Sequence, residues 1–160
     1  MSNRVLVTSL DKRFQKFEKK IKLACQKILK ILSKDNVLVE IYLINSQKMR
    51  FLNKKFRGKN KTTTVLSFEE PRNFILPASK YKKIGEIYLN LARITRGSYT
   101  AEHVRIRERS ANYKKISEGS AYYLIHGLLH LLGYNHKKKS DRIRMEKMEK
   151  LVMRTAKFYK

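Results

Sequence analysis

Three of the four histidines in this 160-residue chain lie in one short segment, HGLLHLLGYNH, at positions 126–136. On a helix, side chains four residues apart lie one turn above each other, so His126 and His130 point the same way. Gly133 can adopt a left-handed backbone conformation that ends the helix and turns the chain back. The turn predicts that His136 meets the other two imidazoles, and three convergent imidazoles are typical of a metal site.

Three neutral imidazole nitrogens suit Zn²⁺, with bonds of about 2.0–2.1 Å. Three protein ligands leave the fourth tetrahedral position to water or substrate, which is typical of a catalytic zinc site. We therefore predict one Zn²⁺ per chain, which lowers the pKa of a bound water to about 7 or polarises a phosphoryl oxygen. The alternative, histidines packed in a core and hydrogen-bonded to backbone, does not account for the third histidine and the glycine together.

The same spacing matches the H-E-x-x-H-x-x-G-x-x-H pattern of the metzincin peptidases. One position of the chain does not fit this pattern. Gly127 stands where the peptidases have their general base, and glycine has no side chain to accept a proton. Peptide hydrolysis by that mechanism is therefore disfavoured.

The charge of the chain points to a polyanionic partner. Its 38 Lys and Arg against 13 Asp and Glu give a formal net charge of +25. Basic side chains that neutralise phosphates release condensed counterions, so nucleic acid is the favoured class of partner. Composition alone also leaves open an anionic membrane surface, or a lysine-rich surface with no particular ligand.

Several protein classes are disfavoured by the sequence. Cys25 is the single cysteine, so no internal disulfide forms, and we expect no disulfide-linked partner. No stretch approaches the roughly 18 apolar residues of a membrane-spanning helix, and we expect no membrane partner. Residues 1–10 are too short and polar for a signal peptide. The sequence therefore predicts a soluble protein of the cytoplasm.

The elements that position the histidines follow from hydrophobic patterning. We expect a helix over 117–132 that is covered on most sides and carries His126 and His130. The pattern predicts further helices at 11–32, after a cap at Asn45 or Ser46, and at 141–159, and strands at 5–9, 37–44, 63–68 and 85–90. The two strands in the middle form a hairpin-like pair, and the segment 91–115 is helical in part. These elements predict an α+β fold for 1–160: a single compact domain with a small mixed sheet, helices packed on it, and a central helix with the metal-binding histidines.

A basic turn follows the second helix, in which Met49, Leu52 and Phe56 share one face. Arg57 opens this turn. Its guanidinium suits a phosphate clamp, because its fork of donors matches phosphate oxygens and it keeps its charge. From the residues alone, a surface arginine on a turn is an equal alternative. Lys59 in the same turn adds unspecific attraction for a polyanion.

The segment 126–136 resembles the H-G-x-L-H-L-x-G-Y-D-H signature of the YbeY family, bacterial metallo-endoribonucleases specific for single strands that mature ribosomal RNA. Residues 52–68 resemble the family's L-N-x-x-[YF]-R-G-K-x-x-x-T-[DN]-V-L-S-F block. Residues 85–89 (GEIYL) resemble its G-D-I-x-I strand. The order and separation of the three blocks fit, and the resemblance extends from about residue 5 to 155.

The resemblance implies a zinc-dependent endoribonuclease that acts in ribosomal RNA processing, including maturation of the small-subunit rRNA 3′ end, and in ribosome quality control. It implies that His126, His130 and His136 are metal ligands and catalytic residues, and that Arg57 is the catalytic arginine near the metal. The implied partners are single-stranded RNA, ribosomal RNA and the small ribosomal subunit. The alternative is a non-catalytic, zinc-stabilised RNA-binding factor for ribosome assembly.

The chain departs from the family pattern at a few positions, none of them a predicted ligand. Asn135 stands where an Asp is usual and could accept from an imidazole N–H without the negative charge, so we expect slightly lower ligand basicity. Thr64 stands where the family has Asp or Asn, and Glu86 stands where it has Asp. Glu86 is a candidate general base only if the fold brings its strand near the metal. His103, outside the cluster, is expected to be an ordinary exposed histidine.

Overall fold

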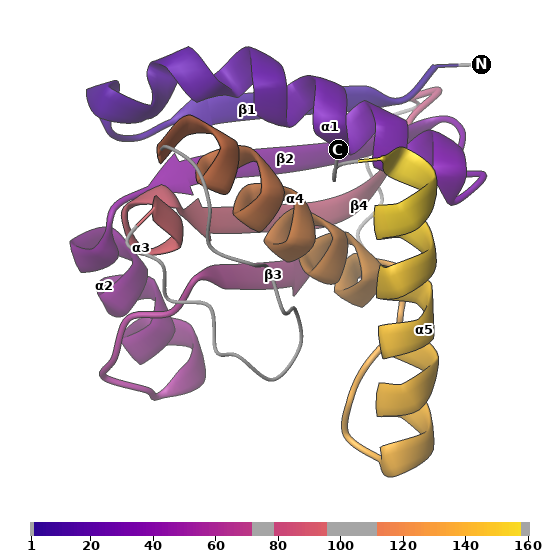
Figure 1. The fold of residues 1–160 in the computed structure, drawn as a ribbon. Coiled ribbons are helices and arrows are strands. Elements are labelled where there is room, and N and C mark those ends of the chain that lie inside the picture. The colour runs from indigo at the N-terminus through magenta and orange to yellow at the C-terminus, as the bar shows by residue number, and fades with distance from the viewer. Residues whose placement is uncertain (1, 72–78, 96–111, 158–160) are drawn as a thin grey trace.

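A four-stranded mixed sheet forms the centre of the computed structural model, which describes residues 2–71, 79–95 and 112–157 (Figure 1). The strand order is β1-β2-β4-β3. β1 runs parallel to β2 and β2 runs parallel to β4, whereas β3 is antiparallel to β4. The strands are β1 (Arg4–Ser9), β2 (Val37–Ile44), β3 (Val65–Glu69) and β4 (Lys82–Asn90). The predicted hairpin-like pair is thus β3 with β4.

The helices are η1 (Lys12–Phe17), α1 (Glu18–Ile31), α2 (Ser46–Arg57), α3 (Leu91–Thr95), α4 (Asn112–Leu131) and α5 (Lys139–Ala156). In Figure 1, α4 crosses in front of the sheet, α1 follows β1, and α5 stands at the far end of α4. This arrangement confirms the predicted α+β class, with a small mixed sheet and a central helix that carries the histidines. None of the helices within the described ranges is both long and apolar enough to cross a membrane.

The first predicted helix begins as a 3-10 helix rather than an α-helix. The Asp11 carboxylate accepts a hydrogen bond from the backbone N–H of Arg13 at 3.1 Å and caps η1. Phe14 and Phe17 are both buried, and their spacing of three matches the 3-10 repeat. α1 then buries Cys25 completely.

The core lies between the sheet and α4. Alternate side chains of β2 point toward the helices, from Val37 to Leu43, because successive strand residues face opposite sides of a sheet. α4 meets them with fully buried leucine and isoleucine side chains at 124, 125, 128 and 129. Its apolar C-terminal half is therefore held on the sheet, while one polar face remains for the histidines.

α2 covers part of the opposite face of the sheet. Asn45 caps it, accepting a hydrogen bond from the N–H of Lys48 at 2.9 Å. Met49 and Leu52 are buried, whereas Phe56, on the same face, is 57% exposed and contacts Phe68 edge to face with ring centroids 5.3 Å apart. Asn53 is buried instead, because its amide donates to the Lys61 carbonyl at 2.7 Å and fixes the basic turn.

Two glycines allow backbones to approach closely beneath the histidines. Gly85 has a φ of +142°, and a Cβ there would overlap the Phe68 carbonyl oxygen. A Cβ on Gly127 would lie 3.0 Å from Ser67 Oγ and 3.2 Å from Ile87 Cγ2. Position 127, where the peptidases have their base, therefore faces the sheet.

The predicted partly helical segment 91–115 is described only at its ends. α3 occupies 91–95 and α4 begins at 112. His103 and the remainder of this segment lie outside the described residues.

Candidate metal centre and basic cleft

His126 and His130 occupy the last turns of α4 and face each other. Their Nε2 atoms are 3.0 Å apart, and their ring centroids are 4.6 Å apart. The helical spacing of four produces this contact, as predicted from the sequence. Both rings are half-buried, so they are accessible from one side.

The chain turns back directly after α4 and brings in the third histidine. Gly133 has a φ of +91°, and the N–H of Tyr134 donates to the Leu129 carbonyl at 2.9 Å, which closes the helix end. The exposed His136 ring then lies 5.0 Å from the His130 ring, centroid to centroid. One ligand nitrogen from each of the three histidines lies within 4.8 Å of the others, and such a group could hold a metal ion.

The hydrogen bonds of two rings show that this donor set fits a metal. His126 Nδ1 lies 2.6 Å from Glu149 Oε1, and His130 Nδ1 lies 2.9 Å from the Tyr134 carbonyl oxygen. Both partners are acceptors, so each Nδ1 carries the proton and each Nε2 presents a lone pair. Two lone pairs that face each other at 3.0 Å repel unless a cation lies between them. The site is therefore arranged for a bound cation.

The electrostatics keep His130 in the neutral form that a metal ligand requires. Its pKa is lowered from 6.5 to about 4, mainly by burial and additionally by the neighbouring imidazoles of His126 and His136. The positive charge of Arg57 acts in the same direction, whereas the Tyr134 carbonyl opposes it. At neutral pH the ring is a ready ligand.

This lowered pKa predicts how the stability of the metal-free protein depends on pH. In the unfolded chain His130 takes up a proton below its ordinary pKa of 6.5, whereas the folded protein resists protonation until about pH 4. The free energy of unfolding should therefore fall as the pH drops through this window. Urea unfolding in EDTA between pH 7 and 4.5 measures the effect. His130→Gln should flatten the dependence, and an unchanged slope in this variant would contradict the assigned pKa.

The three histidines line a cleft of about 500 Å³ together with Arg57. Arg57 ends α2, and its Nη2 donates to the Ser67 carbonyl at 3.2 Å while its guanidinium lies 5.9 Å from the Phe68 ring centroid. The structure therefore brings together all four residues that the resemblance singles out. The other basic residues of the lining are Lys59, Lys61 and Arg93, and no Asp or Glu occurs among the described lining residues.

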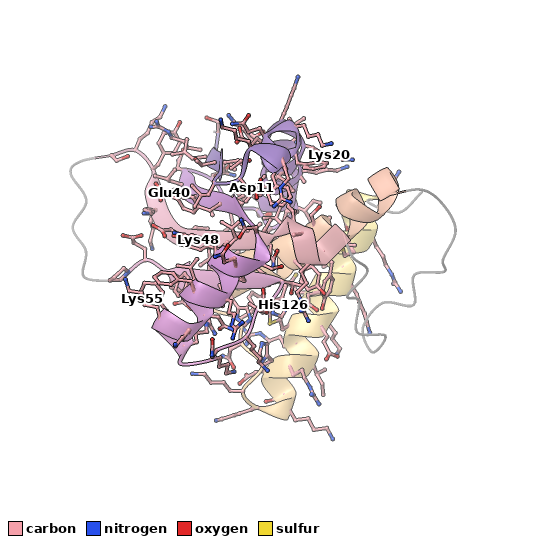
Figure 2. All side chains as sticks on the ribbon, turned by 90° about the vertical axis from the view of Figure 1, so that its left-hand side faces the viewer. Asp11, Lys20, Glu40, Lys48, Lys55 and His126 are labelled. Carbon is pink, nitrogen blue, oxygen red and sulfur yellow. The ribbon has the colours of Figure 1, made fainter. Side chains whose placement is uncertain are left out.

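Glu86 lies on the other face of the sheet from the histidines. It accepts a hydrogen bond from the Tyr88 hydroxyl at 3.0 Å and pairs with Lys83 at 3.2 Å, and Lys83 also pairs with Glu40. The next residue, Ile87, faces Gly127 on α4. In Figure 2, Glu40 lies at the upper left and His126 lies apart from it in the lower centre. The condition for Glu86 as a general base is therefore not met.

The sequence analysis missed the carboxylate that contacts the histidine cluster. Asn135, which could accept from an imidazole, accepts instead from the N–H of Lys137 at 3.1 Å through its Oδ1. The carboxylate that faces an imidazole is Glu149 of α5. One signal was available: Glu149 follows Met145 by four residues and precedes Val152 by three, so a charged residue stands in a buried stripe.

Comparison with known proteins decides the family. The sequence model of the family described as Endoribonuclease YbeY matches residues 7–157. The chain belongs to the YbeY family. It is 34% identical over 139 residues to Endoribonuclease YbeY of Buchnera aphidicola subsp. Schizaphis graminum, covering 86% of this chain and 75% of the relative. It is 31% identical over 139 residues to Endoribonuclease YbeY of Sulfurihydrogenibium sp., covering 87% and 82%.

A solved structure agrees with the fold of this YbeY chain. The solution structure of TM1509 from Thermotoga maritima superposes with a TM-score of 0.52 at 23% identity, covering 96% of this chain and 90% of the other. The family-model match and the relatives named above confirm the predicted resemblance to the YbeY family. Its three sequence blocks correspond here to α2 through β3, to β4, and to the end of α4 with its turn.

Proposed function

We propose that this protein is a zinc-dependent endoribonuclease that cleaves single-stranded RNA. One observation supports this most: three imidazoles converge in a basic cleft beside Arg57, in a chain whose relatives are named Endoribonuclease YbeY. In the proposal, His126, His130 and His136 hold one zinc ion and Arg57 is the catalytic arginine. Residues 1–160 act as one YbeY-like domain.

Two of the histidines, His130 and His136, have distinct parts in this proposal. The Tyr134 carbonyl fixes the ring of His130 and leaves its Nε2 lone pair pointing into the cleft. His136 lies at the exposed side of the cluster, where the cleft opens to substrate. When bound, a zinc ion supplies Lewis-acid chemistry, which polarises a phosphoryl oxygen and makes water more acidic.

Arg57 acts on the phosphate group itself. Its guanidinium has one N–H bound to the Ser67 carbonyl, which fixes the side chain over the cleft. The remaining donors can bind two phosphoryl oxygens at once and stabilise the charge that develops on them as the bond breaks. Because the pKa of a guanidinium is very high, Arg57 keeps its charge at every working pH.

The rest of the cleft suits a single strand of RNA. Lys59, Lys61 and Arg93 attract the phosphate backbone, and no described acidic residue in the lining repels it. The rings of Tyr122 and Tyr123 meet edge to face with centroids 5.2 Å apart and offer surfaces for unpaired bases. In a duplex the bases are already stacked and paired, so these contacts favour a single strand.

We further propose that the substrates include ribosomal RNA, with the 3′ end of small-subunit rRNA among them, and that the protein serves ribosome quality control. This assignment places it in the cytoplasm with the small ribosomal subunit as its partner. It rests on membership of the YbeY family and on the net charge of +25, which favours large RNA assemblies.

The decisive experiment for this function incubates zinc-loaded protein with a labelled single-stranded rRNA fragment and with the same fragment annealed to its complement. We expect cleavage of the single strand, cleavage of the duplex at least about tenfold slower, and none in EDTA. Tight binding of the RNA without any cleavage would contradict the enzyme and favour the non-catalytic assembly factor. Cleavage of casein with none of RNA would favour a peptidase.

A further inference from the structure

Glu149 is a buried carboxylate that the proposed reaction does not use. It lies on α5, in the stripe that packs on α4, and is only 6% exposed. In the part of the chain that the structure describes, its ion-pair contact is His126, at 2.6 Å. Its second carboxylate oxygen lies 3.5 Å from the Tyr122 hydroxyl. Few carboxylates in globular proteins are buried to this degree unless they are paired.

Burying the carboxylate of Glu149 costs free energy, and a packing role does not explain this cost. Removing a carboxylate from water is unfavourable, and an apolar side chain of similar size would pack at least as well on α4. The methionine and valine neighbours of the same stripe show that apolar residues fit there. The reason for the charge must therefore lie in its contact with His126.

We propose that Glu149 is a positioning residue for the metal centre, which holds His126 as the Nδ1–H tautomer with its Nε2 lone pair aimed at His130 and His136. Tyr122 assists by donating its hydroxyl to the other carboxylate oxygen. The inference rests on the proposed metal site. Acceptors on the outer nitrogen of a histidine orient the ring and raise its basicity as a ligand.

A comparison with His130 explains why a side chain, and not a backbone carbonyl, accepts the hydrogen bond from His126. His130 is oriented by the Tyr134 carbonyl, which belongs to the turn that follows its own helix. His126 lies one turn earlier, where the adjacent backbone carbonyls are engaged within α4. Its partner must come from another element, and α5 supplies it. Metal binding and the packing of α5 on α4 are thereby linked.

Glu149→Gln tests the inference, because glutamine keeps the shape and removes the charge. Its amide can also donate to Nδ1, which favours the opposite tautomer. We expect the zinc affinity, measured by competition with a chelator at pH 7.5, to fall about 10–100-fold. In the metal-free protein, long-range ¹H–¹⁵N spectra should show His126 changing from the Nδ1–H form toward the Nε2–H form.

Two further variants, a control and a second test of the same contact, complete the experiment. Glu146→Gln makes the same change on α5, where the side chain is 32% exposed and pairs with Arg142 at 3.9 Å, and should leave both readouts at wild-type values. Tyr122→Phe removes the second contact of Glu149 and should lower the affinity less than Glu149→Gln does. It serves as the test if Glu149→Gln does not fold.

The outcomes separate this inference from the proposed function. Wild-type affinity in Glu149→Gln, or a lower affinity with the His126 tautomer unchanged, would overturn the positioning role. If the wild-type protein bound no zinc, the proposed function would fail. The tautomer in the metal-free protein would then still decide whether Glu149 orients His126.

Discussion

His130→Ala is expected to abolish zinc binding and to lower RNA cleavage by on the order of 10³-fold while the fold persists. Its Nε2 lies 3.0 Å from that of His126, and its ring is 5.0 Å from that of His136, so its loss leaves two imidazoles without the ligand between them. Alanine is a strong helix former, so α4 should remain intact.

Elemental analysis after dialysis, circular dichroism and an RNA cleavage assay measure these effects on one sample. His103→Ala is the matched control, since it removes the one histidine outside the cluster, and we expect normal zinc content and activity. A His130→Ala protein that retained one zinc per chain, or that cleaved RNA at the wild-type rate, would show that the metal-bound cluster is not the active site.

Arg57→Ala is expected to lower kcat about 10²–10³-fold with the zinc content unchanged, because it removes the donors that meet charge developing on the phosphoryl group. Arg57→Lys should restore only part of the activity, since lysine keeps the charge without the planar fork. Single-turnover cleavage at saturating RNA separates this effect from binding. The exposed guanidinium is not part of the core, so stability should change little.

Arg50→Ala is the control for charge alone. Arg50 lies on the same helix and pairs with Asn60 at 3.0 Å, outside the cleft lining, and its loss should leave kcat within about threefold of wild type. A rise in KM with unchanged kcat in Arg57→Ala would mean that this arginine binds the ground state and the transition state equally. That result would contradict its catalytic role.

The histidine cluster could be predicted from the sequence because its geometry is local. A spacing of four on one helix and a glycine at the helix end determine how three imidazoles meet, and both features are visible in eleven residues. The strands were also found, since β2 is an apolar, β-branched run with little interruption and the second half of β4 alternates. The 3-10 helix around Phe14 was missed, and the sequence does not indicate how exposed Phe56 is, because both depend on how an element ends against its neighbours.

The contacts between distant segments could not be predicted from patterning. Arg57 and the histidines line the same cleft only because β3 lies beside α4. That placement follows from the strand order β1-β2-β4-β3. Family resemblance, rather than spacing, pointed to Arg57. Glu149 was missed for the same reason, since its contact with His126 depends on how α5 packs on α4. Glu86 could be excluded as the general base only once the structure showed on which face of the sheet its side chain lies.

X-ray absorption at the zinc edge, on protein purified without added metal, tests most directly whether the three imidazoles hold one ion. We expect about one zinc per chain, with three imidazole nitrogens and one further oxygen or nitrogen ligand at about 2.0–2.1 Å. Zinc absent from the purified protein and not taken up on titration, or bound with fewer than three imidazoles, would contradict the proposed active site.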